Sequence, residues 1–529
     1  MNIQQPSIAE TRSKEIFQLS RDSSTYEVTV DSDITLEDYR KITLEEDWKA
    51  LEKYADQNKG KTVVFINPTM EGGGVAMLRP PLVHVLQMMG VDARWFVMEP
   101  YHSLEVNPFL FTKQMHNIMQ RRTLGDERIT EEGKAIHRDW NDDNAKVLTK
   151  QPAIMNADVI VIDDPQPAPL KKHIDKVNPS TKWVWRNHID TDGELMSDAS
   201  TPQGEIAHYI FEECGIRESD AIVNHPVEKF IYPELRDKTY LAPATIEPFD
   251  DLNRDLSEAE IKEGVEFINN EIKIKNIEFD QAGREEDIQE LIDPDRRRIT
   301  LIARFDESKG MDKAMELGVR TREKMVEEGA NDDELPQIVI IGNGSVDDPS
   351  GIPMYEEMLQ LRREQYPECK KDIIIMRVRH NYMAVNAIMY PREKDGSFDG
   401  SQLVALQTSE AEGCETRITD WLRHGVPVVI SNRGGMKLQV IEGESGTILD
   451  YDKPDWDIDK GAEFIANLMV DKDAYEKMRE STLLASKQFN SREFTTISNT
   501  IRLLRVFSNI SSGVRADKYW KISDIVNIK

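Results

Sequence analysis

The sequence predicts an α/β protein made of two doubly wound domains that face each other across a cleft. Two observations support this prediction. Short apolar runs of strand length alternate with helix-prone stretches along most of the chain, a pattern typical of parallel sheets with helices on both faces. In addition, 529 residues are too many for one ordinary hydrophobic core, so two large domains are expected.

The first half of the chain begins with a polar stretch and then becomes regular. Residues 1–35 show no clear periodicity, and we expect them to form a mobile arm. A strand at Thr62–Asn67 is followed by a glycine loop, Gly72, Gly73 and Gly74, and by a helix over residues 75–89. Residues 36–255 should therefore form the first domain. Its further strands are predicted at residues 93–98, 159–162, 183–185 and 221–223.

The second half repeats this alternation after a charged, helix-prone stretch. We place the connection between the domains in that stretch, residues 256–298, and the second domain at residues 299–509. A turn-rich insertion is expected at residues 395–400. Strands are predicted at residues 300–303, 337–341, 372–376, 402–407 and 427–430, and helices within 459–509.

The most informative segment, residues 409–430, sets two carboxylates eight residues apart. Glu412 precedes a loop at Gly413, Asp420 lies on the predicted helix that follows, and Gly425 is expected to end that helix. One carboxylate at the mouth of the helix can accept hydrogen bonds from sugar hydroxyls, the other can serve a second hydroxylated group, and nearby backbone N–H groups can bind phosphate. An acidic surface loop fits this segment equally well.

A basic pair follows the first strand of the second domain. Arg304 comes directly after this apolar strand and Lys309 lies five residues further on. They should lie at the carboxyl end of a parallel strand, where open α/β sheets bind ligands. An Arg fork and a Lys point charge suit phosphate or diphosphate, although each alone can equally be a solvated surface charge.

Together with other motifs, these segments resemble the retaining glycosyltransferases of family 4, and among them the trehalose phosphorylase and trehalose synthase branch. The resemblance runs from near residue 37 to near residue 490. The motifs that carry it are Leu36-Glu-Asp-Tyr-Arg, Gly72-Gly-Gly-Val-Ala, Ala93-Arg-Trp-Phe-Val, Phe111-Thr-Lys-Gln-Met-His116-Asn, Asp163-Asp-Pro-Gln-Pro-Ala, Trp185-Arg-Asn-His188-Ile-Asp190, Asn224-His-Pro-Val-Glu-Lys-Phe230 and Gly342-Asn-Gly-Ser-Val-Asp-Asp-Pro349. The last two are more similar to the phosphorylases.

The resemblance implies the GT-B fold, in which two Rossmann-like domains bind acceptor and donor on opposite sides of a cleft. It also implies that the tail, residues 510–529, crosses back to the acceptor-side domain. The glycine loop would lie beside the donor phosphate and the acceptor, and His188 would contact the transferred sugar near its 6-hydroxyl. Weaker acceptor contacts are expected from Lys113, His116, Arg186 and Asp190.

The mechanism implied by the family is front-face transfer with retention. The leaving phosphate helps to deprotonate the acceptor, and no protein nucleophile is required. Arg304 and Lys309 would neutralise the leaving charge, while Glu412 would hold donor hydroxyls. No metal-binding cluster is apparent in the sequence, so we expect no metal or other cofactor at the chemical step. The co-substrate would be a nucleoside-diphosphate sugar or inorganic phosphate.

The chain departs from the family at the second carboxylate, which is usually Glu and commonly binds the nucleotide ribose. Here it is Asp420, one methylene shorter, and Glu415 and Arg417 in between are similar to the charged pattern of the phosphorylases, which need no nucleotide. Three enzymatic functions remain open: trehalose phosphorylase, trehalose synthase, and a synthase of another compatible solute, such as mannosyl transfer to glucosyl-glycerate or glucosyl-3-phosphoglycerate. A catalytically silent sugar-binding protein is the alternative of another class.

Composition limits the partners. Ninety-six acidic against 67 basic residues leave a formal charge of −29, which opposes binding to nucleic acid or anionic membrane. No window approaches the roughly 18 apolar residues of a membrane span, and the three cysteines form neither a disulfide framework nor a CxxC pattern. We therefore expect a cytoplasmic protein with small-molecule partners. A homodimer is implied only by the family.

Overall fold

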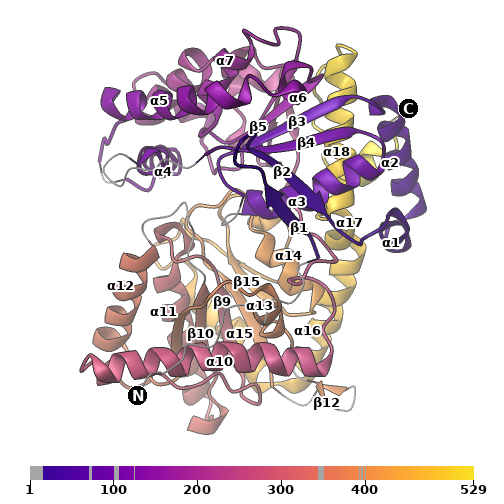
Figure 1. Cartoon of the computed structure of the whole chain (residues 1–529). Helices are drawn as coiled ribbons and strands as arrows, with labels where there is room; N and C mark the ends of the chain where they lie inside the picture. Colours follow the sequence, from indigo (N-terminus) through magenta and orange to yellow (C-terminus); the bar gives the residue numbers. More distant parts are fainter. Residues whose placement is uncertain are drawn as a thin grey trace, which may run out of the picture.

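The computed structural model describes residues 16–70, 74–99, 107–123, 125–342, 351–391, 393–394, 397–398 and 401–528. It confirms the α/β class and the two parallel-sheet domains, which are stacked one above the other in Figure 1. Among the described helices, none combines the length and apolar character needed to cross a bilayer.

The sheet of the N-terminal domain has eight strands within the described residues, in the order β1-β2-β4-β3-β5-β6-β7-β8. From β4 to β8 the pairing is parallel. The strands are β1 (Gln18–Arg21), β2 (Glu27–Asp31), β3 (Thr62–Asn67), β4 (Asp92–Val97), β5 (Val159–Asp163), β6 (Lys182–Arg186), β7 (Ala221–Asn224) and β8 (Thr239–Leu241).

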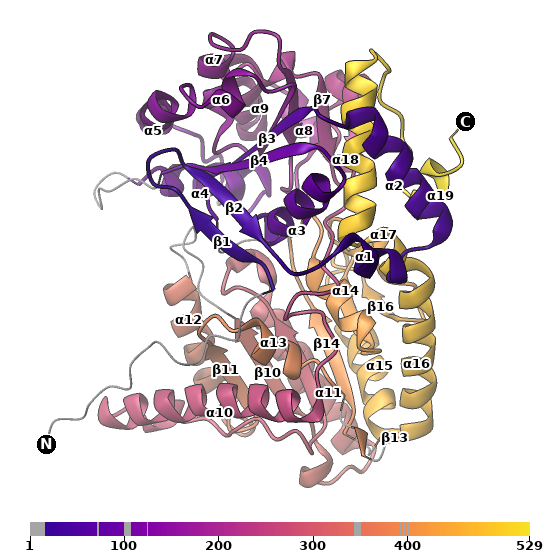
Figure 2. The same ribbon diagram turned by 45° about the vertical axis from the view of Figure 1, so that its right-hand side comes forward.

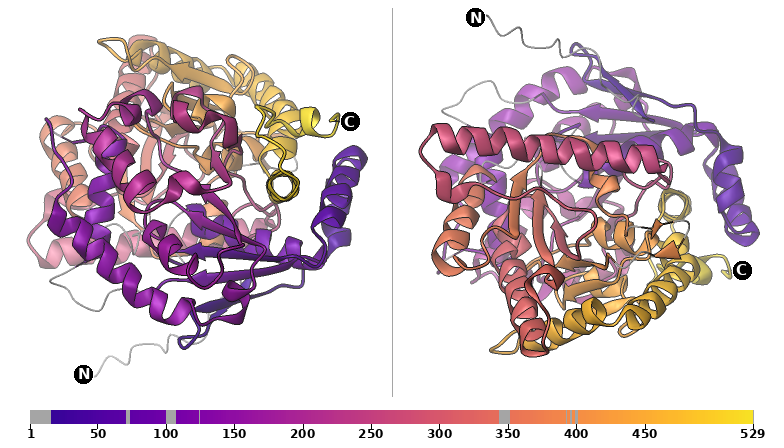
Figure 3. Two further views of the ribbon diagram at one scale, coloured as in Figure 1. Left: turned by 90° about the horizontal axis from the view of Figure 1, so that it is seen from above. Right: turned by 90° about the horizontal axis from the view of Figure 1, so that it is seen from below.

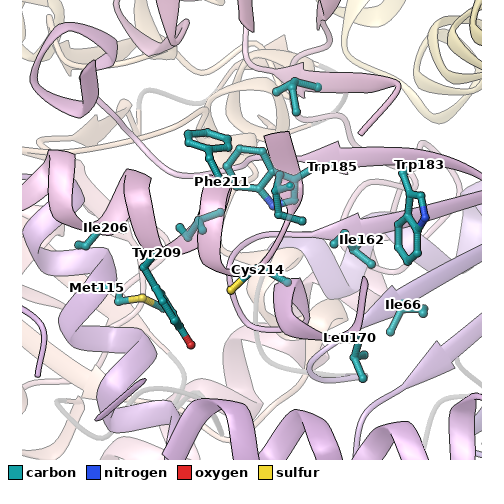
Figure 4. Packing of buried hydrophobic residues seen from close by; sticks show 14 of the residues in the cluster. Ile66, Met115, Ile162, Leu170, Trp183, Trp185, Ile206, Tyr209, Phe211 and Cys214 are labelled. Carbon is teal, nitrogen blue, oxygen red and sulfur yellow. The ribbon is translucent and has the colours of Figure 1, made fainter. Parts of the chain in front are cut away.

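Both faces of this sheet are buried under helices. Along β3, Val64 and Ile66 pack into one core, while Val63 and Phe65 pack into another. This alternation follows from the two-residue period of a strand. Figure 4 shows part of the first core, where Ile66 and other apolar side chains gather around the sheet. The helices of this domain are α1 (Leu36–Ile42), α2 (Glu45–Asn58), α3 (Gly74–Met88), α4 (Pro108–Met119), α5 (Glu131–Leu148), α6 (Pro152–Met155), α7 (Lys171–Ile174), α8 (Gly193–Ser197) and α9 (Pro202–His208).

The expectation of a mobile arm over residues 1–35 is wrong for its second part. Strands β1 and β2 form an antiparallel hairpin, and β2 joins the edge of the sheet at β4. Val28 is buried, and Leu19 and Val30 pack against the same core, because β2 alternates apolar and polar residues. Residues 1–15 lie outside the described residues.

The sheet of the C-terminal domain contains six strands in the described part of the chain, all parallel, in the order β11-β10-β9-β14-β15-β16. Five of them were predicted, and β16 was missed. The strands are β9 (Arg298–Ile302), β10 (Gln337–Gly342), β11 (Ile373–Arg377), β14 (Leu403–Gln407), β15 (Val428–Ser431) and β16 (Gly446–Leu449). In the insertion expected at 395–400, β12 (Glu393–Lys394) and β13 (Ser397–Phe398) pair as a small hairpin, and residues 395–396 and 399–400 lie outside the described residues.

Each sheet has a point where the strand order reverses. In the first sheet the chain goes from β3 outward to β4 and returns to β5, and in the second it goes from β9 to β11 and returns to β14. The crevice at the carboxyl ends of such strands is the usual ligand site of open α/β sheets. The two crevices face each other between the domains, where they line one cavity.

The stretch expected to connect the domains is instead part of the second domain. Helix α10 (Glu258–Gln281) packs on α13 (Tyr382–Ala387) and lies along the lower edge of the molecule in Figure 1. Its Val265, Ile268 and Ile272 share a core with strands β10 and β11. The other helices of this domain are α11 (Met311–Glu327), α12 (Gly351–Gln365), α14 (Thr416–Arg423), α15 (Ile458–Val470), α16 (Lys472–Ala485) and α17 (Ser491–Glu493).

The chain returns to the first domain earlier than expected. Helix α18 (Thr496–Ser511), not only the tail 510–529, packs on α2 and α3 and lies against the first domain in Figures 1 and 2. Its Ile501 and Leu504 belong to the core that also contains Val63. The short helix α19 (Ile522–Ile525) follows and lies on the same domain, near α2 in Figure 3. Lys529 lies outside the described residues.

Candidate active site

A cavity of about 290 Å³ lies between the domains, at the carboxyl ends of the strands that flank both reversal points. It brings together most of the residues that the sequence predicted. His188, Lys113, His116 and Gly74 line it from the first domain, and Arg304, Lys309, Glu412 and Gly413 line it from the second. The other two glycines of the predicted loop, Gly72 and Gly73, lie outside the described residues.

The basic pair follows β9, as predicted. Lys309 lines the cavity, and glycine is required at the next position, Gly310, because a β-carbon there would lie 2.2 Å from the carbonyl oxygen of Thr408. Nζ of Lys309 donates to Oε2 of Glu412 at 2.5 Å and to Oε2 of Glu415 at 2.7 Å. The lysine is therefore clamped between two carboxylates, only one of which the sequence had predicted as a ligand of the sugar.

This clamp is a coupled, buried charge cluster. Burial lowers the pKa of Lys309, but Glu412 and Glu415 outweigh it and raise that pKa above its usual value. Burial raises the pKa of Glu412, whereas Lys309 and Arg417 overcome burial at Glu415 and lower its pKa. The cluster therefore keeps a charged lysine and a charged Glu415 at the donor side of the cavity.

His188 faces these groups from the end of β6. Its Nε2 lies 2.9 Å from Oδ1 of Asp163. The other oxygen of this carboxylate, Oδ2, accepts hydrogen bonds from the buried Arg79 guanidinium and from the side-chain amide of Asn67. Burial alone would raise the pKa of Asp163, but the Arg79 charge lowers it well below its usual range. A charged carboxylate thus fixes the orientation of His188 at the wall of the cavity.

Sequence reasoning missed Asp164 as a site residue. It follows β5, has a φ of 60°, lines the cavity and accepts a hydrogen bond from the backbone N–H of His188 at 2.8 Å. Burial raises its pKa to about 6. The signal was present, because two acidic residues before a proline at a strand end indicate a strained turn at the edge of the sheet.

Two of the predicted acceptor contacts do not line the cavity. Arg186 is 1% exposed and lies beneath the site, where it donates to the carbonyl of Pro243. Asp190 is 3% exposed and accepts the backbone N–H of Glu412 at 3.2 Å, so it joins the two domains. Both side chains are used by protein groups in this structure, so their contact with an acceptor stays a prediction.

Asp420 lies on the helix after Gly413, as predicted, but does not line the main cavity. It is fully buried on α14 and lies outside the main cavity, where Nη1 of Arg417 donates to its Oδ2 at 2.5 Å. Burial raises its pKa to about 6. Its carboxylate borders a separate small cavity of about 10 Å³ instead, near Glu247 and Asp250. The pairing with Arg417, three residues earlier on the same helix, is the physical cause.

The domains are held closed around the cavity. Lys113 on α4 donates to Oδ2 of Asp306 at 2.6 Å, and Arg122 pairs with Glu410 of the second domain. Close approach of the backbones adds to this, since a β-carbon at Gly413 would lie 2.0 Å from the carbonyl oxygen of His188. The site is therefore assembled from both domains and is complete only when they meet.

Two facing doubly wound domains with a substrate-sized cavity at their paired strand ends define a protein of the GT-B class. Solved structures share this fold. The UDP-forming α,α-trehalose-phosphate synthase of Burkholderia xenovorans, in complex with glucose-6-phosphate, has a TM-score of 0.57 and 12% identity, over 84% of this chain and all of that one. Sucrose-phosphate synthase of Thermosynechococcus elongatus has a TM-score of 0.55 and 12% identity, over 86% and 100%.

Sequence relatives are more specific. Residues 65–231 match the family described as "Trehalose synthase, N-terminal domain". The trehalose synthase of Thermococcus litoralis is 30% identical over 445 residues, which are 84% of this chain and 90% of that protein. The trehalose phosphorylase of Pleurotus pulmonarius is 31% identical over 504 residues, 93% of this chain. The chain spans 63% of that fungal protein's length. The chain belongs to the trehalose synthase and trehalose phosphorylase family.

Proposed function

We propose that the protein is a retaining glycosyltransferase of trehalose metabolism that transfers glucose between trehalose and inorganic phosphate. The observation that carries the proposal is the arrangement of Arg304 and Lys309 opposite His188 in one interdomain cavity. The similarity to a trehalose phosphorylase also supports it. In addition, Asp420, the carboxylate expected to bind a nucleotide ribose, borders a separate small cavity and not the main one.

The reaction would proceed on one face of the transferred glucose. A phosphate oxygen forms the new bond to C1 as the C1–O bond of trehalose breaks, and the phosphate proton passes to the oxygen of the departing glucose. Glucose 1-phosphate keeps the α configuration, and atoms balance without a further reactant. Arg304 and Lys309 hold the phosphate charge, and removing one such preorganised donor typically costs about 10²–10³ in rate.

The protein would contribute positioning around this exchange. Glu412 is proposed to bind hydroxyls of the transferred glucose, and His188, oriented by Asp163, to bind the same sugar from the other domain. Asp164, at the first-domain wall, is suited to accept hydroxyls of the second glucose. The chemistry assigned to these residues requires no metal. The three cysteines, all described and all free, suit a reducing cytoplasm.

Turnover of purified protein tests the proposal. Trehalose with phosphate should give glucose 1-phosphate, whose α anomer is identified by NMR, and EDTA should not reduce the rate. Parallel reactions contain nucleoside-diphosphate glucose with glucose, and nucleoside-diphosphate mannose with glucosyl-glycerate or glucosyl-3-phosphoglycerate. Nucleotide release in one of these, without phosphorolysis, would identify a synthase. Absence of turnover in every reaction would support a silent sugar-binding protein.

A further inference from the structure

The N-terminus of α14 opens into the donor side of the cavity. Thr416 and Arg417, its first two residues, line the cavity beside Lys309. Backbone N–H groups at a helix start, together with a lysine, form the kind of site that binds a phosphate group. A diphosphate whose first phosphate group lay at Arg304 would need this neighbouring position for its second phosphate group.

A carboxylate already occupies that position. Glu415 caps α14, with Oε1 accepting the backbone N–H of Arg417 at 3.2 Å and Oε2 accepting Nζ of Lys309 at 2.7 Å. Its side chain is 11% exposed, and its own carbonyl oxygen accepts Nε2 of Gln439 at 3.0 Å. The Glu415 carboxylate therefore already binds a backbone N–H group at the start of α14 and the ammonium group of Lys309.

Arg417 binds the carboxylate of Asp420, the group that would otherwise be available to the ribose of a nucleotide. Its guanidinium donates to Oδ2 of Asp420 at 2.5 Å, and Asp420 is fully buried and does not line the main cavity. Oδ1 of Asp420 is buried and has no hydrogen-bond partner among the described residues. The carboxylate is thus held away from the cavity by one bond, although its second oxygen remains unsatisfied.

We propose that Glu415 and Arg417 are specificity-determining residues that restrict the donor side to a single phosphate group and exclude nucleoside diphosphates. Glu415 does so by like-charge repulsion at the second phosphate position, and Arg417 by withdrawing Asp420 from the ribose position. The inference rests on the proposed function, because it concerns the phosphate site of that reaction. It adds the reason why a fold shared with UDP-forming enzymes would accept orthophosphate.

The test measures binding, separately from turnover. Isothermal titration gives dissociation constants of orthophosphate, pyrophosphate and UDP, GDP and ADP for the wild type, Glu415→Gln and Arg417→Met. The wild type should bind orthophosphate more tightly than any nucleoside diphosphate. Glu415→Gln should shift the ratio of diphosphate to orthophosphate affinity by roughly tenfold or more, with pyrophosphate and nucleotides changing alike. Arg417→Met should raise the affinity for nucleoside diphosphates by roughly tenfold relative to the affinity for pyrophosphate. The variant releases Asp420, and only nucleotides carry a ribose for it to bind.

The matched control is Glu442→Gln. Glu442 likewise accepts a backbone N–H, that of Ile448, and a lysine, Lys460, but it does not line the cavity. Its substitution should leave every affinity ratio unchanged. Thermal unfolding checks that each variant folds. If Glu415→Gln unfolds, Glu415→Ser replaces it, because serine is neutral but can still cap α14, and it should give the same shift in the affinity ratio.

The outcomes separate the two proposals. A wild type that binds a nucleoside diphosphate more tightly than orthophosphate, or ratios unchanged within about twofold in both variants, overturns the role of Glu415 and Arg417. Absence of phosphorolysis in a wild type that nevertheless prefers orthophosphate overturns the proposed function and leaves the assignment of the two residues in place.

Discussion

Lys113 and Asp306 are bonded across the interdomain cleft, with Nζ and Oδ2 2.6 Å apart. Lys113 lies on α4 of the first domain, and Asp306 follows β9 of the second. Both residues line the cavity, and a second ion pair between the domains, Arg122–Glu410, adds to this contact. Both bonds join side chains of the two domains, so they favour the closed arrangement.

Breaking this pair should open the cleft. In Lys113→Met the cross-domain bond is lost, so we expect a larger radius of gyration in solution scattering without substrate, and a KM raised by about three- to tenfold with a smaller change in kcat. Lys146→Met is the control, since Lys146 pairs with Asp143 on the surface of a single helix. Identical scattering profiles of Lys113→Met and the wild type would contradict a role in closure.

The basic pair should dominate catalysis. We expect Arg304→Ala or Lys309→Ala to lower kcat by roughly 10²–10³, because each removes a charge that stabilises the leaving or attacking phosphate. Steady-state phosphorolysis measures the effect. Lys262→Ala, an exposed substitution on α10, serves as the control. A loss confined to KM in both active-site variants would show that the charges bind phosphate without stabilising the transition state.

Asp163 should matter for stability as well as for His188. Asp163→Asn leaves the fully buried Arg79 guanidinium without its countercharge, which typically costs about 3–5 kcal/mol in free energy of unfolding. Urea denaturation of the variant gives the value directly. Asp139→Asn, at an exposed position on α5, should cost less than about 0.5 kcal/mol. A loss at Asp163 no larger than this control would mean that the pair is not the buried charge pair described above.

The connection between the domains, residues 242–257 between β8 and α10, should make the stability of the protein depend on pH. Burial raises the pKa of Glu247 to about 7 and, with the charges of Glu247 and Asp420, raises that of Asp250 to about 8. Glu247 accepts hydrogen bonds from Tyr39 and Thr496, and Arg417 and Arg423 are the nearby cations.

The sign follows from these raised pKa values. The folded protein holds protons on these acids that the unfolded chain has already released, so their contribution is fully present below about pH 4 and is lost as pH rises through about 7 to 8. We expect the Tm of the wild type, relative to Asp250→Asn, to fall between pH 5 and 8.5. Asp255→Asn, exposed on the same connection, should follow the wild type. Parallel Tm curves of the wild type and Asp250→Asn would refute the assignment.

The strands that could be predicted from the sequence are those whose own composition shows that they are buried. Fully buried strands such as β5, Val-Ile-Val-Ile-Asp, are apolar up to their carboxyl end because helices cover both faces. The edge strand β2 and the four-residue β16 were missed, since short or alternating segments depend on their neighbours for burial.

The same distinction applies to the site. The position of Arg304, Lys309 and Glu412 at strand ends follows from the topology, and they lie together as predicted. The position of the Asp420 carboxylate depends on its bond to Arg417, which follows from the orientation of the two side chains and not from the sequence pattern. Asp190 likewise became a contact between the domains because the backbone of Glu412 reaches it.

The return of α18 to the first domain has a consequence for synthesis of the chain. Ile501, Leu504 and Phe507 complete a core that includes Val63 and Leu51 near the beginning of the sequence. The first domain therefore stays short of its full core until residues 496–511 have left the ribosome, and until then part of its apolar surface is exposed. A fragment ending before residue 496 would lack this helix, so the two halves of the molecule are not separable units.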